Sequence, residues 1–340
     1  MSVKTNELRQ AASTSTEDYL LVDSPTAGTV RVPLSAAAEY FDAELVKSGT
    51  QLNAALSSKA IWEMLPNQDL LDNGDFRHVV NQRGADRYAS SGKMIYTIDR
   101  WALGGDTDMP EWSMRIIENH GITLAKGSAL IQYFEESRWP VGSQLTFSAM
   151  IDGKVYSVSF IADATSDYAG VTFENGFRLA WNGSGRYVQI YNHAGTGAEL
   201  VIAAKLEPGI HQTLAHQEAD GTWLLNNPPT NKALELTKCQ RYQMVIPYAR
   251  IRASARNNNG LQFDLPIPTT LRAKPILVNA VEGSTYRIID GLVYSNYADG
   301  FSLSVTTMPS GLVSISAHKE NHGLSDACIL IQGVILDANL

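Results

Sequence analysis

The sequence predicts a mainly β protein, and three observations lead to this class. Apolar and polar residues alternate along short segments such as 145–151 and 156–162, as they do in half-buried strands. Glycines follow such segments about every 8–12 residues, the spacing of turns in all-β domains. No strand–helix–strand alternation is visible, so a doubly wound nucleotide-binding fold is not expected.

Residues 1–48 are expected to form a small N-terminal β-α unit. Strands are predicted at 19–22 and 29–34, each bounded by a proline, and Ser35 fits the N-cap of a helix that runs to about Ser48. Residues 49–66 then predict a helical linker, because Leu52, Leu56 and Ile61 recur at helical spacing.

Residues 67–243 are predicted to form a jelly-roll β-sandwich. Asp152-Gly153 is a type I′ hairpin signal between the alternating segments 145–151 and 156–162. Further strands are expected at 171–173, 177–181, 187–191 and 199–203, each punctuated by glycine. Many short strands with glycine turns are typical of sandwiches and jelly rolls.

Residues 244–340 are predicted to form a C-terminal β domain. The expected strands are 245–255, 261–265, 276–281, 286–289, 301–306, 312–317 and 328–336, with a turn at 257–260. The chain ends on an apolar segment, so we expect the last strand to dock in a sheet.

Composition limits the classes of function. The chain has 340 residues with a net charge of −8, which disfavours nucleic-acid binding because that requires a basic surface. No apolar run approaches the length of a membrane span, so no membrane insertion is expected, and the first residues lack the apolar core of a classical secretory signal. The two cysteines, Cys239 and Cys328, are expected to be buried free thiols.

Enzyme signatures are absent from the sequence, so we expect a protein that is not an enzyme and has no cofactor. No nucleophile elbow, phosphate-binding loop, dinucleotide fingerprint or His-Glu-x-x-His is found. Glu135 and Glu136 are adjacent, and along a strand they would face opposite sides, which favours a solvated strand end over an acid/base pair. We expect no metal site, and Asp106 and Asp108 are the candidate ligands if a structural calcium ion is present.

Aromatic residues give the best signal for a binding site. Five of the six tryptophans fall in the middle region, where large rings mostly build cores. An exposed ring can instead stack on the apolar face of a sugar. Tyr187 and Tyr191 share one face of a strand that follows a Gly-Ser-Gly turn. The glycan-binding candidates are therefore Tyr187, Tyr191, Trp112, Trp139 and Trp181.

Several separated motifs resemble those of bacteriophage tail fibre proteins. LLDNGDFR at 70–77, NQRG at 81–84 and YTIDRW at 96–101 resemble the opening of their jelly-roll domain, and ELTKCQRY at 235–242 resembles its closing segment. LPIP at 265–268 with LRAKP at 271–275 resembles the entry to their C-terminal β domain. The ending LDANL is similar to theirs, with Asn339 where an acid is usual. The stretch 223–229 departs from the pattern, because the usual Gln-Leu-Glu strand is missing.

The resemblance implies a virion protein made in the host cytoplasm and assembled as a homotrimer. The N-terminal unit would anchor it to other virion proteins, and the β domains would bind a host surface polysaccharide or another receptor. It also implies that Asn73, Gly74, Arg83, Asp99 and Trp101 build the fold. Two alternatives remain open at this point, a capsid (head) fibre or decoration protein and a glycan depolymerase.

Overall fold

The computed structural model describes residues 19–24, 28–33, 68–218, 220–226, 231–291, 297–308 and 311–339. The chain divides into two compact units, residues 1–66 and 67–340. In the first unit, β1 (Tyr19–Ser24) pairs antiparallel with β2 (Gly28–Pro33), which confirms the two strands expected there. The predicted helix from Ser35 to Ser48 and the helical linker at 49–66 lie outside the described residues.

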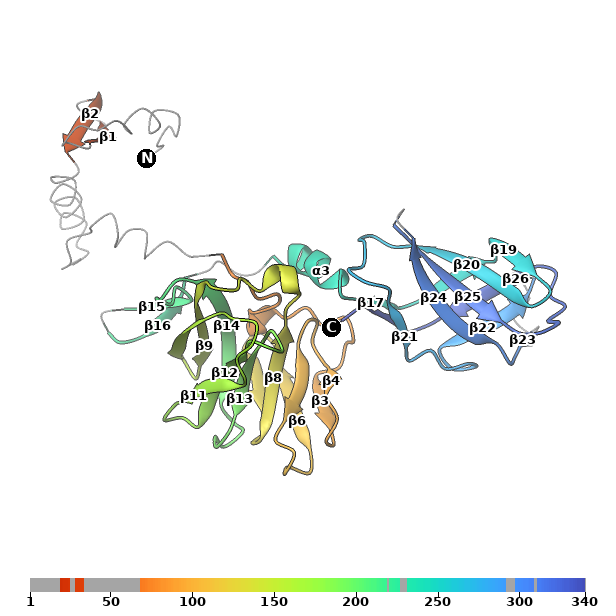
Figure 1. Cartoon of the computed structure of the whole chain (residues 1–340), viewed down its shortest axis with the longest axis horizontal. Helices are drawn as coiled ribbons and strands as arrows, with labels where there is room; N and C mark the ends of the chain where they lie inside the picture. Colours follow the sequence, from red (N-terminus) through yellow and green to blue (C-terminus); the bar gives the residue numbers. More distant parts are fainter. Residues whose placement is uncertain are drawn as a thin grey trace. The chain divides into compact units, whose positions relative to one another are not determined.

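The second unit is mainly β, and its sheets are antiparallel (Figure 1). Within the described ranges, α3 (Lys232–Gln240) is the only α-helix, accompanied by two short 3-10 helices, η1 (Phe76–His78) and η2 (Glu136–Arg138). No helix in those ranges has the length and hydropathy that crossing a bilayer would require.

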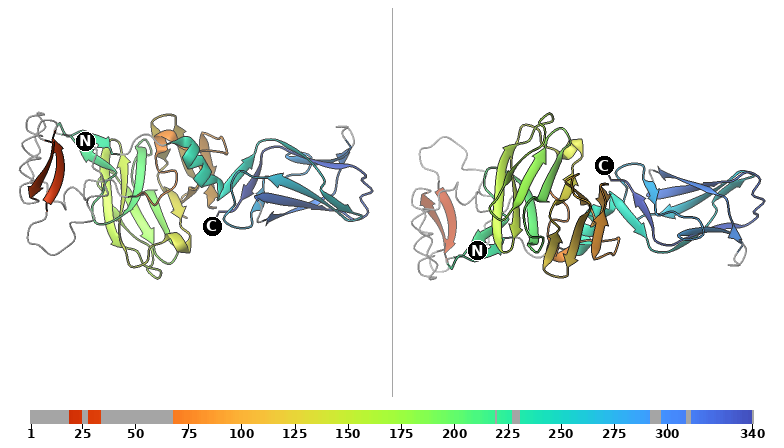
Figure 2. Two further views of the ribbon diagram at one scale, coloured as in Figure 1. Left: turned by 90° about the horizontal axis from the view of Figure 1, so that it is seen from above. Right: turned by 90° about the horizontal axis from the view of Figure 1, so that it is seen from below.

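Two six-stranded sheets enclose one core in the first part of this unit (Figure 2). One sheet has the spatial order β10 (Lys154–Ile161), β9 (Gln144–Ile151), β14 (Leu200–Pro208), β7 (Gly121–Leu124), β6 (Trp112–Ile117) and β3 (Arg87–Ser90). The other has the order β11 (Ala169–Thr172), β12 (Phe177–Asn182), β13 (Tyr187–Asn192), β8 (Ser128–Tyr133), β5 (Ala102–Gly105) and β4 (Ile95–Tyr96). Fully buried Phe147 and Leu206 of the first sheet share a core with Leu130 and Ile190 of the second.

The β9–β10 hairpin confirms the turn predicted from Asp152-Gly153. Asp152 has φ 47° and Gly153 has φ 73°, so both central residues adopt the left-handed conformation that a type I′ turn requires. Ile151 pairs with Lys154 directly across the turn, which sets the register of both strands.

Three smaller sheets enclose a second core. The first sheet has the spatial order β17 (Gln243–Ile246), β27 (Val334–Asp337) and β21 (Ile276–Val278). The second has the order β18 (Ala249–Arg252), β26 (Ala327–Ile331), β22 (Tyr286–Asp290) and β23 (Tyr297–Ala298). The third has the order β19 (Ala255–Asn257), β20 (Gly260–Pro266), β25 (Leu312–His318) and β24 (Ser302–Met308). Phe263, Ile315, Ile329 and Leu336 are buried together between them. As expected, the last strand, β27, docks in a sheet, where it pairs with β17 and β21.

Two of the predicted long strands are interrupted. The segment 245–255 is divided among β17, β18 and β19, and Pro247, which has no backbone donor, lies at the first break. The segment 328–336 is divided between β26 and β27 by a turn at Gly333, where φ is 70°. The turn at 257–260 and its partner strand are confirmed by the β19–β20 hairpin.

The sequence did not reveal α3 or the small hairpin of β15 (Ala215–Gln217) and β16 (Trp223–Leu225). Asn231 caps α3, because its side-chain oxygen accepts hydrogen bonds from the backbone N–H groups of Ala233 and Leu234. Cys239 in this helix and Cys328 in β26 are both buried and free, as predicted.

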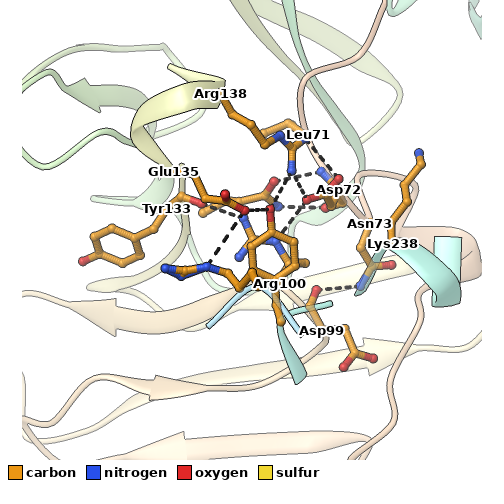
Figure 3. Close-up of polar contacts among 12 residues, drawn as sticks. Leu71, Asp72, Asn73, Asp99, Arg100, Tyr133, Glu135, Arg138 and Lys238 are labelled. Atoms are coloured by element: carbon orange, nitrogen blue, oxygen red, sulfur yellow. Dashed lines mark hydrogen bonds and ion pairs between the residues drawn. The ribbon is translucent and has the colours of Figure 1, made fainter. Parts of the chain in front are cut away.

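A buried carboxylate organises the start of the second unit (Figure 3). The Asp72 side chain is 4% exposed, and its Oδ2 lies 3.0 Å from Nε of Arg100 and 2.6 Å from Nη1 of Arg138. Burial alone would oppose ionisation, but the hydrogen bonds and charges of Arg138 and Arg100 outweigh it and hold the pKa of Asp72 below its usual value. Asp72 is therefore an ionised group held between two cations.

Tyr242 completes this group. The Arg100 guanidinium lies 3.5 Å from the centre of the Tyr242 ring, and the Tyr242 hydroxyl donates to Glu135 at 2.6 Å. Glu135 is therefore a partly buried acceptor next to η2, so the prediction of a solvated side chain is wrong for Glu135. It is confirmed for Glu136, whose side chain is 83% exposed. We refer to Asp72, Arg100, Glu135, Arg138 and Tyr242 as the Asp72 cluster.

Asn73 and its neighbours make the structural contacts expected of them. The Asn73 side chain accepts from the backbone N–H of Val80 and donates to the carbonyls of Val80 and Asp99. The indole N–H of Trp101 donates to the Asn73 carbonyl, and Trp101 is fully buried. These bonds fold residues 73–80 against the segment that ends at Trp101.

Gly74 lies where a side chain has no room. An alanine Cβ would lie 2.5 Å from the carbonyl oxygen of Ala204, whose backbone N–H donates to Gly74 at 2.8 Å. We expect Gly74→Ala to lower the free energy of unfolding by about 1–3 kcal/mol, the usual effect of overpacking. Gly260→Ala is the matched control, because its nearest neighbour would be 3.6 Å away. Equal thermal unfolding of the two variants would contradict this prediction.

Removing the Asp72 charge is expected to lower the free energy of unfolding at pH 7 by about 3–5 kcal/mol, because Asp72→Asn leaves Arg100 buried without a counter-charge. The folded pKa lies below the usual 3.8, so Asp72 stabilises the fold above that pH and loses this effect as the pH falls through its folded pKa. Urea denaturation should show a deficit of Asp72→Asn that is constant near neutral pH and shrinks as the pH falls below 3.8. Exposed Asp108→Asn serves as the control, and a deficit independent of pH would refute the assignment.

Candidate binding surface

The outer face of the sheet that contains β13 carries two of the aromatic candidates, Tyr187 and Tyr191. Val188 and Ile190 of β13 are fully buried in the core. Because side chains alternate along a strand, Tyr187, Gln189 and Tyr191 point to the opposite side of the sheet. Tyr187 and Tyr191 are partly exposed there, whereas Gln189 is 8% exposed.

The neighbouring strand β8 and the segment just before β11 add further rings to this face. Tyr133 of β8 lies directly opposite Tyr187 in the sheet register, and the two rings are 5.2 Å apart. Arg178 of β12 lies opposite Tyr191, and its guanidinium is 4.7 Å from the centre of the Tyr168 ring. The name tyrosine face is used below for the group Tyr133, Tyr168, Arg178, Tyr187 and Tyr191.

Small residues lie between these rings. Ala129 is the cross-strand partner of Tyr191, and Ala180 is the partner of Gln189; both alanines are fully buried. The aromatic rings and the Arg178 guanidinium therefore supply the surface that a ligand would meet. Tyr168 is the most exposed of the four tyrosines, at 39%.

The hydroxyl groups of the tyrosine face remain protonated at neutral pH. Burial raises the pKa of each of its four tyrosines above the usual value of 10, and the neighbouring Asp106 adds to the effect at Tyr191. Each hydroxyl can therefore donate one hydrogen bond and accept others.

Asp106 lies at the margin of this face. Its Oδ2 is 3.5 Å from the Tyr191 hydroxyl, and its Oδ1 accepts from the backbone N–H of Asp108. Across the described residues, no group of three or more His, Cys, Asp or Glu side chains is arranged to hold a metal ion. Asp106 is thus placed as an acceptor beside the rings.

The three tryptophan candidates do not join the tyrosine face. Trp112 and Trp139 are 5% and 3% exposed, so neither ring offers a face to a ligand. Trp181 packs against the same core, where its ring stacks on Phe160 at 4.5 Å, and Phe160 lies 6.2 Å from Trp139. Trp139, Phe160 and Trp181 thus form a row of aromatic rings. Burial corrects the selection of Trp112 and Trp139 as sugar-stacking residues, and one face of the partly buried Trp181 ring is covered by Phe160.

Tyr133, Tyr168 and Arg178 were not singled out from the sequence. The alternation of Tyr133 with the buried Leu130 and Gln132 places it on the outer face once β8 is known to be a strand. Its pairing with Tyr187, 54 residues further along the chain, depends on sheet register, which no local pattern contains.

The chemistry of the tyrosine face suits a flat ligand that is rich in hydroxyl groups. Ring faces pack against C–H groups, and phenol hydroxyls together with the Arg178 guanidinium supply hydrogen bonds around them. None of the protein-family models matches this chain, and no curated protein matches it either.

Proposed function

We propose that the chain is a bacteriophage virion fibre protein, a tail fibre or receptor-binding protein that attaches to the particle by its N-terminal unit and binds a host cell-surface glycan with its β domains. The observation that carries the binding part is the tyrosine face, on which Tyr133 and Tyr187 pair across two strands with their rings 5.2 Å apart.

The architecture supports the modules that this role needs. Two six-stranded antiparallel sheets around one core favour a jelly-roll domain within residues 67–243. Three further sheets around a second core favour a separate C-terminal β domain within residues 244–340. Rigid β modules with buried cysteines suit a protein that must persist outside the cell.

A sugar ligand suits the tyrosine face better than an apolar one. The rings are only partly exposed, and protonated hydroxyls and Arg178 surround them, so the surface offers stacking and hydrogen bonds together. Each such site binds weakly. A homotrimer presents several copies, and linked sites raise avidity by about 10²–10⁴ when they engage together.

Binding to the host polysaccharide should fail when the rings are removed. Tyr187→Ala and Tyr191→Ala are each expected to reduce retention of the full chain on a glycan array about tenfold or more, the effect of losing an aromatic anchor. Tyr248→Ala is the control, since Tyr248 is 59% exposed and lies outside the tyrosine face.

Unchanged binding by both variants, with intact thermal unfolding, would remove the tyrosine face from the proposal. Release of shortened oligosaccharides from the array would replace the adhesin with a glycan depolymerase.

Assembly has its own test. The subunit mass is 37.1 kDa, and light scattering after size exclusion is expected to give three times this value. A single species at the subunit mass across the concentration range would refute the trimer and the avidity argument with it.

A further inference from the structure

A pocket of about 540 Å³ lies at one end of the sheet that contains β10, away from the residues of the tyrosine face. Its lining comes from the β9–β10 turn, from the turn between β11 and β12, and from the β15–β16 hairpin. Pockets that bind small molecules span about 300–1,000 Å³, so this one is large enough for a sugar unit. The lining residues used below are Asp152, Lys154, Tyr156, Glu174, Gln217 and Trp223.

Trp223 supplies the apolar wall of this pocket, which is called the Trp223 pocket below. It is partly buried because it packs against the small cluster of Met150, Ala203 and Leu214. The hairpin that carries it is held by cross-strand pairing with Gln217, whose side-chain amide also donates to the Gly221 carbonyl at 3.0 Å. The indole is thus fixed in position before a ligand arrives, which lowers the entropy cost of binding.

Polar side chains line the rest of the pocket. Asp152 is oriented by the backbone N–H of Leu200, which donates to its Oδ1 at 2.8 Å, and the exposed Glu174 lines the same pocket. Burial, with the nearby charge of Glu174, raises the pKa of Tyr156, so its hydroxyl is protonated and donates to Glu174. Lys154 adds an ammonium donor to the two carboxylate acceptors.

We infer that the Trp223 pocket binds a neutral hexose unit, and this inference rests on the proposed function only for the source of that hexose, the host polysaccharide. An indole face complements the C–H face of a pyranose ring, and carboxylates accept hydrogen bonds from its hydroxyl groups. Two carboxylates face one ammonium group here, so an acidic sugar meets net repulsion.

Calorimetric titration of the full chain with lactose and maltotriose tests the inference, with sialyllactose as the acidic probe. At least one neutral probe is expected to bind more tightly than sialyllactose. Trp223→Ala should weaken that binding about tenfold or more, and Glu174→Gln about fivefold. Leu224→Ala is the matched control, because Leu224 is 47% exposed and alternates to the other face of the same strand.

Equal affinity of the parent chain, Trp223→Ala and Glu174→Gln would overturn the pocket, as would tighter binding of sialyllactose. If Trp223→Ala unfolds at a lower temperature, Glu174→Gln decides, because an exposed side chain contributes little to packing. Loss confined to Tyr187→Ala and Tyr191→Ala would overturn the pocket and leave the proposed function standing. Loss confined to Trp223→Ala and Glu174→Gln supports the pocket and counts against the tyrosine face.

Discussion

The fold of the second unit depends on the buried charge of Asp72. An ionised carboxylate at this depth is strongly destabilising unless cations reach it, so the segments that carry Arg100 and Arg138 must close around residue 72. Tyr242 then covers Arg100, which ties the residue before β17 to the same charge. One carboxylate thus sets the relative places of segments that are far apart in the sequence.

Local signals were sufficient for much of the fold. The β9–β10 hairpin was predictable because alternation and an Asp-Gly turn act within a few residues, and the β19–β20 turn was predictable for the same reason. The helix α3 was not, because its sequence has no clear apolar stripe and only Glu235 and Cys239 are buried. The Asp72 cluster could not be predicted either, since its members come from segments that are far apart in the sequence.

The candidate site, too, was predictable only where local sequence decides the structure. Tyr187 and Tyr191 share a face because they are four residues apart in one strand, which the sequence shows directly. Whether a ring is exposed or buried depends on how the two sheets pack around their shared core, and no local pattern shows that Trp112 and Trp139 are buried in it. Strand parity identifies residues that share a face, but the burial of a ring depends on all the elements that pack around the core.

Tyr133 connects the Asp72 cluster to the tyrosine face. Its carbonyl oxygen accepts a hydrogen bond from Arg100 at 2.7 Å, while its ring points away from the cluster, as Figure 3 shows, and lies beside Tyr187. The backbone beneath the rings is therefore clamped on one side by an ion pair and on the other by its sheet neighbours. Tyr133 and Tyr187 are thus held in position by their strands, and for the binding that we propose we expect association to proceed without a preceding backbone rearrangement of these two strands.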